Sequence, residues 1–281
     1  MGLKLGLLTN SLIHVGWDLG QIAKWANANG IKYLEVGPTA PLELGLFENV
    51  QSQYDVEIKA LIYCRNFLAE NEEEAKMHQD ALKARIKTAG QLDNDVLVVA
   101  STGRPKGADT KLTKGLKAVV RFLEEMLELA ELHNVKLAVE NCPMMGNIAV
   151  SPYMYELLFS EIQNPLLGWA YDPSHLVFQF CDIYNPIIDY KERIYHVHAK
   201  DTLIDYSALA KMGTLAGQDW WRYCLPGKGA VDWRKIMANL KQSDYRGIVS
   251  IEHEDRCWSN TPEQITQGIL LAKEHLEHSL K

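Results

Sequence analysis

Residues 194–201 read Ile-Tyr-His-Val-His-Ala-Lys-Asp, a largely apolar run with His196, His198 and Lys200 at every second position. Side chains two residues apart in a strand point to the same face. These three polar side chains therefore share one face, and Val197 and Ala199 lie on the other. The run predicts a strand of a parallel sheet, covered by helices on one side and polar on the other.

Seven other short runs have the same near-continuous apolarity and a high content of β-branched and aromatic residues. Such runs are typical of strands buried on both faces. We therefore expect eight strands in all. In chain order they are Lys4–Thr9, Tyr33–Val36, Val56–Tyr63, Val96–Ala100, Lys136–Glu140, Leu167–Tyr171, Ile194–Ala199 and Gly247–His253.

Stretches with apolar residues at helical spacing lie between the runs. Asp18, Ser151, Asp232 and Thr261 stand just before four of them and are expected to be N-caps, and Gly90 is expected to end another. The expected helices are Leu19–Asn29, Glu70–Gly90, Leu112–His133, Pro152–Ile162, Trp233–Gln242 and Pro262–Leu276, with weaker patterns at Leu42–Tyr54 and Tyr184–Tyr190.

Eight strands alternating with about eight helices is the element count of a (β/α)8 TIM barrel, an α/β fold that we expect to form one domain over residues 1–281. The competing fold is a doubly wound open sheet. That fold usually has a glycine-rich turn after its first strand, whereas residues 10–14 here read Asn-Ser-Leu-Ile-His. A GxxxxGK[ST] nucleotide-binding loop is also absent from the sequence.

Composition limits the possible partners and the compartment. The formal net charge of −7 and the lack of a basic run disfavour nucleic acids and anionic membranes. No apolar run approaches the roughly 20 residues that cross a bilayer. The five cysteines show no CxxC spacing, which disfavours a disulfide framework or a structural zinc site. We therefore expect a cytoplasmic protein.

Four successive predicted strands end in residues that can bind a metal. Glu140 ends the fifth strand, Asp172 follows the sixth, His198 lies near the end of the seventh and Glu252 near the end of the eighth. In a barrel these ends meet at the catalytic face. Several buried charges are costly unless something pairs them, and a divalent cation is the simplest partner. This donor set suits Mn²⁺, Co²⁺, Mg²⁺ or Zn²⁺.

For several residues near these four, the sequence allows both a functional and a purely structural role. Lys200 is expected above the metal, where it could hold a substrate oxygen or form an ion pair with Asp201 or Asp172. His196 is expected one layer lower, packed or hydrogen-bonded. Glu35, at the inward end of the second strand, could bind sugar hydroxyls or form an ion pair.

Alternation also places Glu252 and Glu254 on one face, with His253 facing outward. Residues 213–227 are expected to form a loop that caps the site or contacts another subunit, so a homo-oligomer is possible.

An ordered set of motifs resembles a known family, the xylose isomerase-like TIM barrels of the sugar-phosphate isomerase/epimerase superfamily. The resemblance covers essentially the whole chain and is densest from 135 to 255. The motifs are Val-Glu140-Asn, Asp172-Pro-Ser-His175, His196-Val-His198-Ala-Lys-Asp, Gly227-Lys-Gly229-Ala-Val-Asp232-Trp233 and Ile-Glu252-His-Glu-Asp.

The resemblance implies roles for individual residues. Glu140, Asp172, His198 and Glu252 would hold one divalent ion, with Mn²⁺ the first choice, and Glu140 and Glu252 would also be the acid–base pair. His175 would contact the substrate. The implied activity is epimerisation or isomerisation of a ketose, keto-sugar or inosose by proton abstraction next to a carbonyl, through an enediolate.

Three alternatives stay open at this point. The same enolate could lose a β-hydroxyl, which would make the protein a lyase or dehydratase of an inosose or a 3-keto-glycoside. A sugar-binding barrel without activity is a second alternative. The third, a DNA-repair enzyme like endonuclease IV, would need extra histidines on the early strands and an Asp-x-His motif where this chain has Asp232-Trp233-Arg234. The expected partner is thus a small sugar or polyol.

Overall fold

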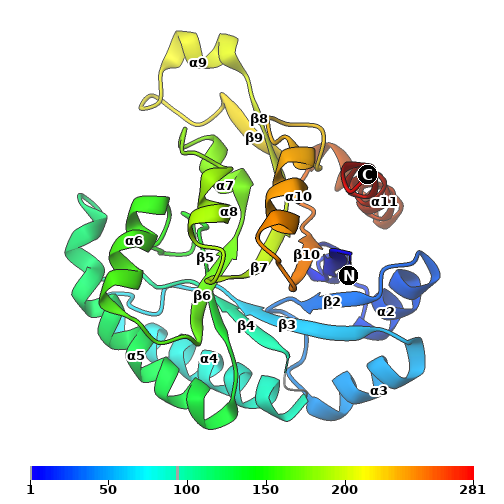
Figure 1. Ribbon diagram of the computed structural model, residues 1–281, viewed down its shortest axis with the longest axis horizontal. Coiled ribbons are helices and arrows are strands. Elements are labelled where there is room, and N and C mark those ends of the chain that lie inside the picture. The colour runs from blue at the N-terminus through cyan, green and yellow to red at the C-terminus, as the bar shows by residue number, and fades with distance from the viewer. Residues whose placement is uncertain (1, 93–94) are drawn as a thin grey trace.

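The computed structural model describes residues 2–92 and 95–281, and its centre is a closed barrel of eight parallel strands (Figure 1). Around the barrel the strand order is β1-β10-β7-β6-β5-β4-β3-β2. This confirms the predicted (β/α)8 barrel. The barrel strands are β1 (Lys4–Leu8), β2 (Tyr33–Val36), β3 (Glu57–Tyr63), β4 (Leu97–Ala100), β5 (Leu137–Glu140), β6 (Leu167–Tyr171), β7 (Ile194–Ala199) and β10 (Ile248–Ile251).

The first and last barrel strands pair with each other, which rules out the open doubly wound sheet. Lys4 pairs with Ile248, and the register continues to Leu7 and Ile251. Gly6 lies at this seam, where a Cβ would stand 2.9 Å from the Cδ1 atom of Ile248. A larger residue would therefore displace the Ile248 side chain and would also stand 3.1 Å from the carbonyl oxygen of Tyr33 on β2.

Helices surround the barrel, and their inward faces form the main apolar core with the outer face of the strands (Figure 1). A second, small apolar cluster of Leu8, Ala60, Val99, Ala138, Ala170 and neighbours fills the barrel interior. The long helices are α2 (Leu19–Ala28), α3 (Leu44–Tyr54), α4 (Glu72–Leu92), α5 (Leu116–His133), α6 (Pro152–Glu161), α10 (Trp233–Gln242) and α11 (Pro262–Ser279). Shorter ones are α1 (Asn10–Ile13), η1 (Leu112–Gly115), α7 (Pro173–Val177), α8 (Asn185–Asp189) and η2 (Arg256–Trp258).

The structure confirms all four predicted N-cap positions, and at three of them the side chain makes a capping hydrogen bond. Asp18 forms a full capping box with Gln21, and the side chains of Asp232 and Thr261 accept hydrogen bonds from the backbone three residues on. The Ser151 side chain makes no capping hydrogen bond, so the first turn of α6 relies on Pro at its start instead.

Gly90 does not end its helix, because α4 continues to Leu92. A Cβ at Gly90 would lie 2.7 Å from the carbonyl oxygen of His133. The glycine thus allows α4 to approach the end of α5 closely. The prediction mistook a packing glycine for a helix terminator.

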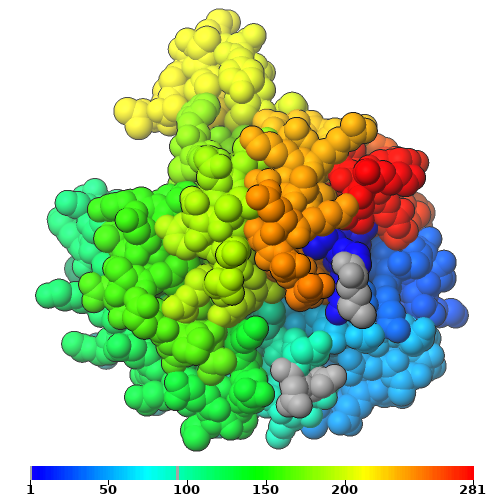
Figure 2. Space-filling model, viewed as in Figure 1, coloured from blue at the N-terminus to red at the C-terminus, as the bar shows by residue number. Residues whose placement is uncertain are grey.

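One segment stands away from the barrel, and the space-filling view shows it as a projection (Figure 2). It consists of the antiparallel strands β8 (Asp201–Ile204) and β9 (Trp221–Cys224), with α9 (Tyr206–Met212) between them. The expected loop at 213–227 therefore contains a strand. The ring of Trp221 stacks on that of Phe178, with centroids 3.8 Å apart and planes 3° apart, which fastens the hairpin to the barrel.

Among the described helices, none combines the length and the apolar character needed to cross a membrane.

Candidate active site

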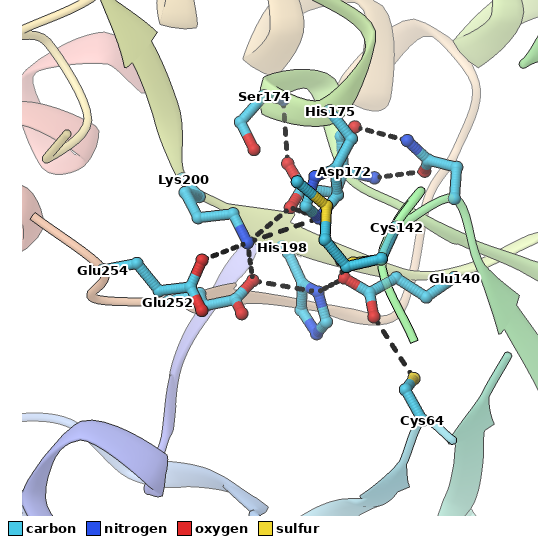
Figure 3. Close-up of polar contacts among 12 residues, drawn as sticks. Cys64, Glu140, Cys142, Asp172, Ser174, His175, His198, Lys200, Glu252 and Glu254 are labelled. Atoms are coloured by element: carbon cyan, nitrogen blue, oxygen red, sulfur yellow. Dashed lines mark hydrogen bonds and ion pairs between the residues drawn. The ribbon is translucent and has the colours of Figure 1, made fainter. Parts of the chain in front are cut away.

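The four predicted metal ligands come together at the carboxyl end of the barrel. Glu140, Asp172, His198 and Glu252 can each offer one ligand atom so that all four atoms lie within 4.8 Å of one another. The first three side chains are fully or almost fully buried, and that of Glu252 is 12% exposed. In Figure 3 the two glutamates lie on either side of the His198 ring. We call these four residues the quartet.

The two nitrogens of His198 face different groups. Its Nδ1 atom lies 3.1 Å from Glu140 Oε1 and 3.3 Å from Glu252 Oε2. Its Nε2 atom lies 3.0 Å from Glu35 Oε1. Nδ1 is therefore the nitrogen directed at the other quartet members, and Glu35 fixes the ring from the opposite side.

Glu35 and His196 lie beneath the quartet, inside the barrel. The Glu35 carboxylate is fully buried and also contacts His196 Nε2 at 2.8 Å. Burial alone raises the pKa of this carboxyl, but the two neighbouring histidines outweigh it and hold the pKa of Glu35 well below its usual range. Of the two interactions expected for Glu35, the structure shows ion pairs, with His196 and His198. His196 occupies the lower layer, as predicted.

Lys200 directly follows β7 and is buried among carboxylates (Figure 3). Its Nζ atom lies 2.9 Å from Glu252, 3.1 Å from Glu254 and 3.2 Å from Asp172. Burial lowers the pKa of the amine, but these three charges outweigh burial and raise the pKa of Lys200 well above its usual value. Because Glu252 and Glu254 both contact Lys200, the structure confirms that they lie on one face.

Asp201 and His253 lie close to Lys200 and Glu252 in the chain but make structural contacts instead. Asp201, one of two predicted ion-pair partners of Lys200, instead accepts hydrogen bonds from the backbone of Thr202, Gly227 and Val231. His253 faces outward as predicted, since a Cβ on Gly268 of α11 would lie 2.6 Å from its Nε2 atom. Both residues fasten the rim of the barrel to its surrounding segments.

The hairpin brings Tyr223 to the quartet. The Oη atom of Tyr223 lies 2.7 Å from His175 Nδ1, and its ring lies 4.7 Å from the ammonium of Lys200. His175 Nε2 in turn lies 3.2 Å from Asp172 and 3.4 Å from Glu140. His175, predicted to contact substrate, is thus fixed beside the quartet from two directions.

Asp172 is positioned by local geometry and by Asn141, which directly follows β5. It caps the short helix α7, accepting a hydrogen bond from the Ser174 amide at 2.8 Å. Asn141 brackets its backbone, donating to the Asp172 carbonyl at 2.8 Å and accepting from the Asp172 amide at 2.9 Å. The indole of Trp169 also donates to Asn141. This clamp holds the ends of β5 and β6 together.

The two quartet glutamates differ in acidity when no metal is bound. Burial raises both pKa values. At Glu140, His198 and His175 outweigh burial and hold the pKa well below its usual range. At Glu252, burial prevails over Lys200 and His198, and the pKa rises to about 7. The thiol of Cys64 adds a hydrogen bond to Glu140 Oε2 at 3.3 Å.

The quartet suits a divalent ion by its chemistry and its spacing. Two donors that are each about 2.1 Å from one ion lie at most about 4.2 Å apart, and the four ligand atoms all lie within 4.8 Å of one another. Asp172 Oδ2 and Glu252 Oε2 are buried and make no hydrogen bond with the part of the chain that the structure describes. Both oxygens form an ion pair with the Lys200 ammonium, at 3.2 and 2.9 Å, so an ion would share them with Lys200.

A model of the family described as "Xylose isomerase-like TIM barrel" matches residues 22–275. The chain belongs to the xylose isomerase-like TIM barrel family. Members and neighbours of this fold differ in the activities that their names record. An inosose dehydratase of Clostridium beijerinckii is 26% identical over 243 residues, which cover 80% of this chain and 78% of the relative.

Two solved structures have the same fold as this xylose isomerase-like TIM barrel. A D-tagatose 3-epimerase-like protein superposes with a TM-score of 0.75 at 20% identity, covering 99% of this chain and 98% of the other. The IolI protein, crystallised with a bound zinc atom, superposes with a TM-score of 0.73 at 18% identity, covering 99% and 96%.

Sequence reasoning missed several contacts around the quartet. Tyr223 lies within the loop expected at 213–227, and nothing in the local sequence indicates that β9 pairs with β8. Cys64 ends an early strand with inward parity, a signal that could have placed it near Glu140. The Asn141 clamp had no sequence signal beyond its position after Glu140.

Proposed function

We propose that this protein is a divalent-metal-dependent epimerase or isomerase of a ketose, keto-sugar or inosose, acting by proton transfer next to a carbonyl. The carrying observation is the placement of Glu140 and Glu252 on either side of His198, each within 3.3 Å of the same ring nitrogen (Figure 3). Two carboxylates so arranged can reach opposite faces of one substrate carbon.

Glu140, Asp172, His198 and Glu252 would hold the ion. When bound, it would act as a Lewis acid that stabilises the negative charge of an enediolate. One glutamate takes the proton from the carbon beside the carbonyl. The other returns a proton to the opposite face of that carbon, which is epimerisation, or to the neighbouring carbon, which is isomerisation.

Lys200, His175 and Tyr223 complete the proposed site. The Lys200 ammonium keeps its proton and can hold a substrate oxygen while it neutralises Glu252 and Asp172. His175 contacts the substrate from the α7 side, and Tyr223 holds its Nδ1 atom. Because Lys200 already faces three carboxylates, these residues favour an uncharged sugar or polyol as substrate.

A dehydratase acting through the same enolate is the second candidate. The similarity to the inosose dehydratase of Clostridium beijerinckii favours it. In that case the second proton goes to a leaving β-hydroxyl, which departs as water. Both candidates use the same base and the same stabilised enolate, and they differ in the fate of that intermediate.

The test is metal analysis of the purified protein, followed by NMR in D₂O with ketoses, inososes and 3-keto-glycosides. We expect one divalent ion per chain and deuterium at a single carbon of one substrate class. Conversion to a sugar epimer or isomer supports the first candidate, and loss of water supports the second.

Two results would contradict the proposal. One is a protein that holds no divalent ion and does not change its melting temperature when Mn²⁺, Co²⁺ or Zn²⁺ is added. The other is turnover that persists in full after chelation, because a quartet without its ion leaves the enediolate charge without its Lewis acid.

A further inference from the structure

A cavity lies at the other end of the barrel, where the strands begin. Its volume is about 580 Å³, which is within the range of small-molecule sites. It is lined by the starts of β1 and β10, by the segments leading into β4, β5 and β7, and by residues 243–247. None of the quartet residues lines it.

Lysines occupy the barrel positions at this end. Barrel interiors are usually layers of branched apolar side chains from alternate strands. Here Lys4 begins β1, Lys59 lies in β3 and Lys136 directly precedes β5, and all three line the cavity. Lys4 and Lys136 have the same parity as Leu8 and Ala138 of the inner apolar cluster, so they belong to the barrel's inner face.

The positive charge in the cavity is only partly neutralised. Lys59 pairs with Asp95 at 2.7 Å, and Arg246 pairs with Asp244 at 3.2 Å. Within residues 2–92 and 95–281, the other three lining lysines, Lys4, Lys136 and Lys191, form no ion pair with a carboxylate. Glu192 is the remaining acidic residue of the lining.

The floor of the cavity carries a buried polar atom without a partner. His196 lines the cavity and is fully buried. Its Nε2 atom is engaged by Glu35, whereas its Nδ1 atom has no hydrogen-bond partner in the described chain. A hydroxyl group of a bound ligand can supply the missing partner, because a hydroxyl both donates and accepts hydrogen bonds.

We propose that this cavity binds a small hydroxylated oxyanion, a phosphorylated polyol or sugar, with the ammonium groups of Lys4, Lys136 and Lys191 around the phosphate and His196 Nδ1 facing a hydroxyl. The volume exceeds what phosphate alone would fill, which favours the ester over the free ion. This site is separate from the quartet and does not depend on the proposed function.

The test is calorimetric titration of the metal-loaded protein with glucose 6-phosphate, inorganic phosphate and glucose at low ionic strength. Lys4→Gln/Lys136→Gln is compared with Lys87→Gln/Lys117→Gln, which removes the same charge from exposed positions on α4 and α5. We expect glucose 6-phosphate to bind more tightly than phosphate, and glucose not to bind. The cavity variant should lose at least about tenfold in affinity, and the control less than about twofold.

Circular dichroism and the melting temperature of each variant establish that it is folded. Three outcomes overturn the proposal. Glucose 6-phosphate does not bind the wild-type protein at millimolar concentration, or both variants lose affinity equally, which indicates a general charge effect. In the third outcome, the cavity variant binds as tightly as wild type, which places the ligand elsewhere, such as at the quartet.

Discussion

The two halves of the barrel differ at the carboxyl ends of their strands. β5, β6, β7 and β10 end at the quartet, whose side chains point at one another and make few hydrogen bonds to the backbone. The polar residues at the ends of β1 to β4 bind the protein itself: Thr9 accepts from the Gly37 amide at 2.9 Å, and Ser101 accepts from the Arg65 amide at 3.0 Å. In one half the carboxylates face one another, two histidines and Lys200, and in the other half the polar side chains bind backbone amides.

This difference between the two halves makes testable predictions. The largest expected loss of activity is that of the quartet glutamate variants. Glu140→Gln and Glu252→Gln should each lower the exchange rate in D₂O by about 10²–10⁴-fold, because an amide cannot take the proton. Glu254→Gln is the matched control, since Glu254 contacts Lys200 but is 47% exposed. Equal losses in all three variants would mean that the quartet glutamates have no special role.

A smaller effect is expected from the supporting half. Glu35→Gln removes the charge that faces His198 Nε2 and should weaken divalent-metal affinity by about 10–100-fold, measured by competition with a chelator. Ser101→Ala, from the same half, should cost about 1 kcal/mol of stability and leave metal affinity unchanged. If Glu35→Gln binds metal as tightly as wild type does, the half of the barrel formed by β1 to β4 does not position the quartet.

The quartet should also give the metal-free protein a pH-dependent stability. Glu252 titrates near 4.5 in the unfolded chain, and burial raises its pKa to about 7 in the folded one. Between these values the folded state retains a proton that the unfolded state has lost. Stability should therefore fall as pH rises through this window, by at most about 1.4 kcal/mol per pH unit.

Urea unfolding of the metal-free protein at several pH values measures this slope. Glu252→Gln cannot titrate, so the difference between wild type and variant isolates the contribution of Glu252 from those of the neighbouring histidines. A wild-type curve parallel to that of the variant would contradict the raised pKa.

The smallest effect is expected from the hairpin, which belongs to neither half. Tyr223→Phe removes the hydroxyl beside His175 Nδ1 and should change kcat/KM by about 2–10-fold, the size of one hydrogen bond. Tyr206→Phe, on the exposed helix α9, is the control and should leave kinetics unchanged. A Tyr206→Phe effect as large as that of Tyr223→Phe would indicate a role for the whole hairpin rather than for one hydroxyl.

Sequence periodicity predicted most of the barrel because each strand is a continuous apolar run with local signals at its ends. The quartet could be predicted for a related reason: parallel strands in a barrel bring equivalent ends together, so Glu140 and Glu252 meet although they are far apart in the chain. The prediction failed where tertiary packing sets the structure. Gly90 serves a helix–helix contact, and β9 exists only because β8 pairs with it.

The seam between β1 and β10 has a consequence for synthesis of the chain on the ribosome. Lys4 pairs with Ile248, so about 240 further residues must be synthesised after β1 before its partner strand exists. At about 5–20 residues per second this interval is about 10–50 s, during which β1 presents an unpaired edge. Glu252 follows β10 directly, so a nascent chain that has not closed its seam also lacks the fourth ligand. Binding of an ion by all four quartet residues would therefore require that β10 and Glu252 have been synthesised.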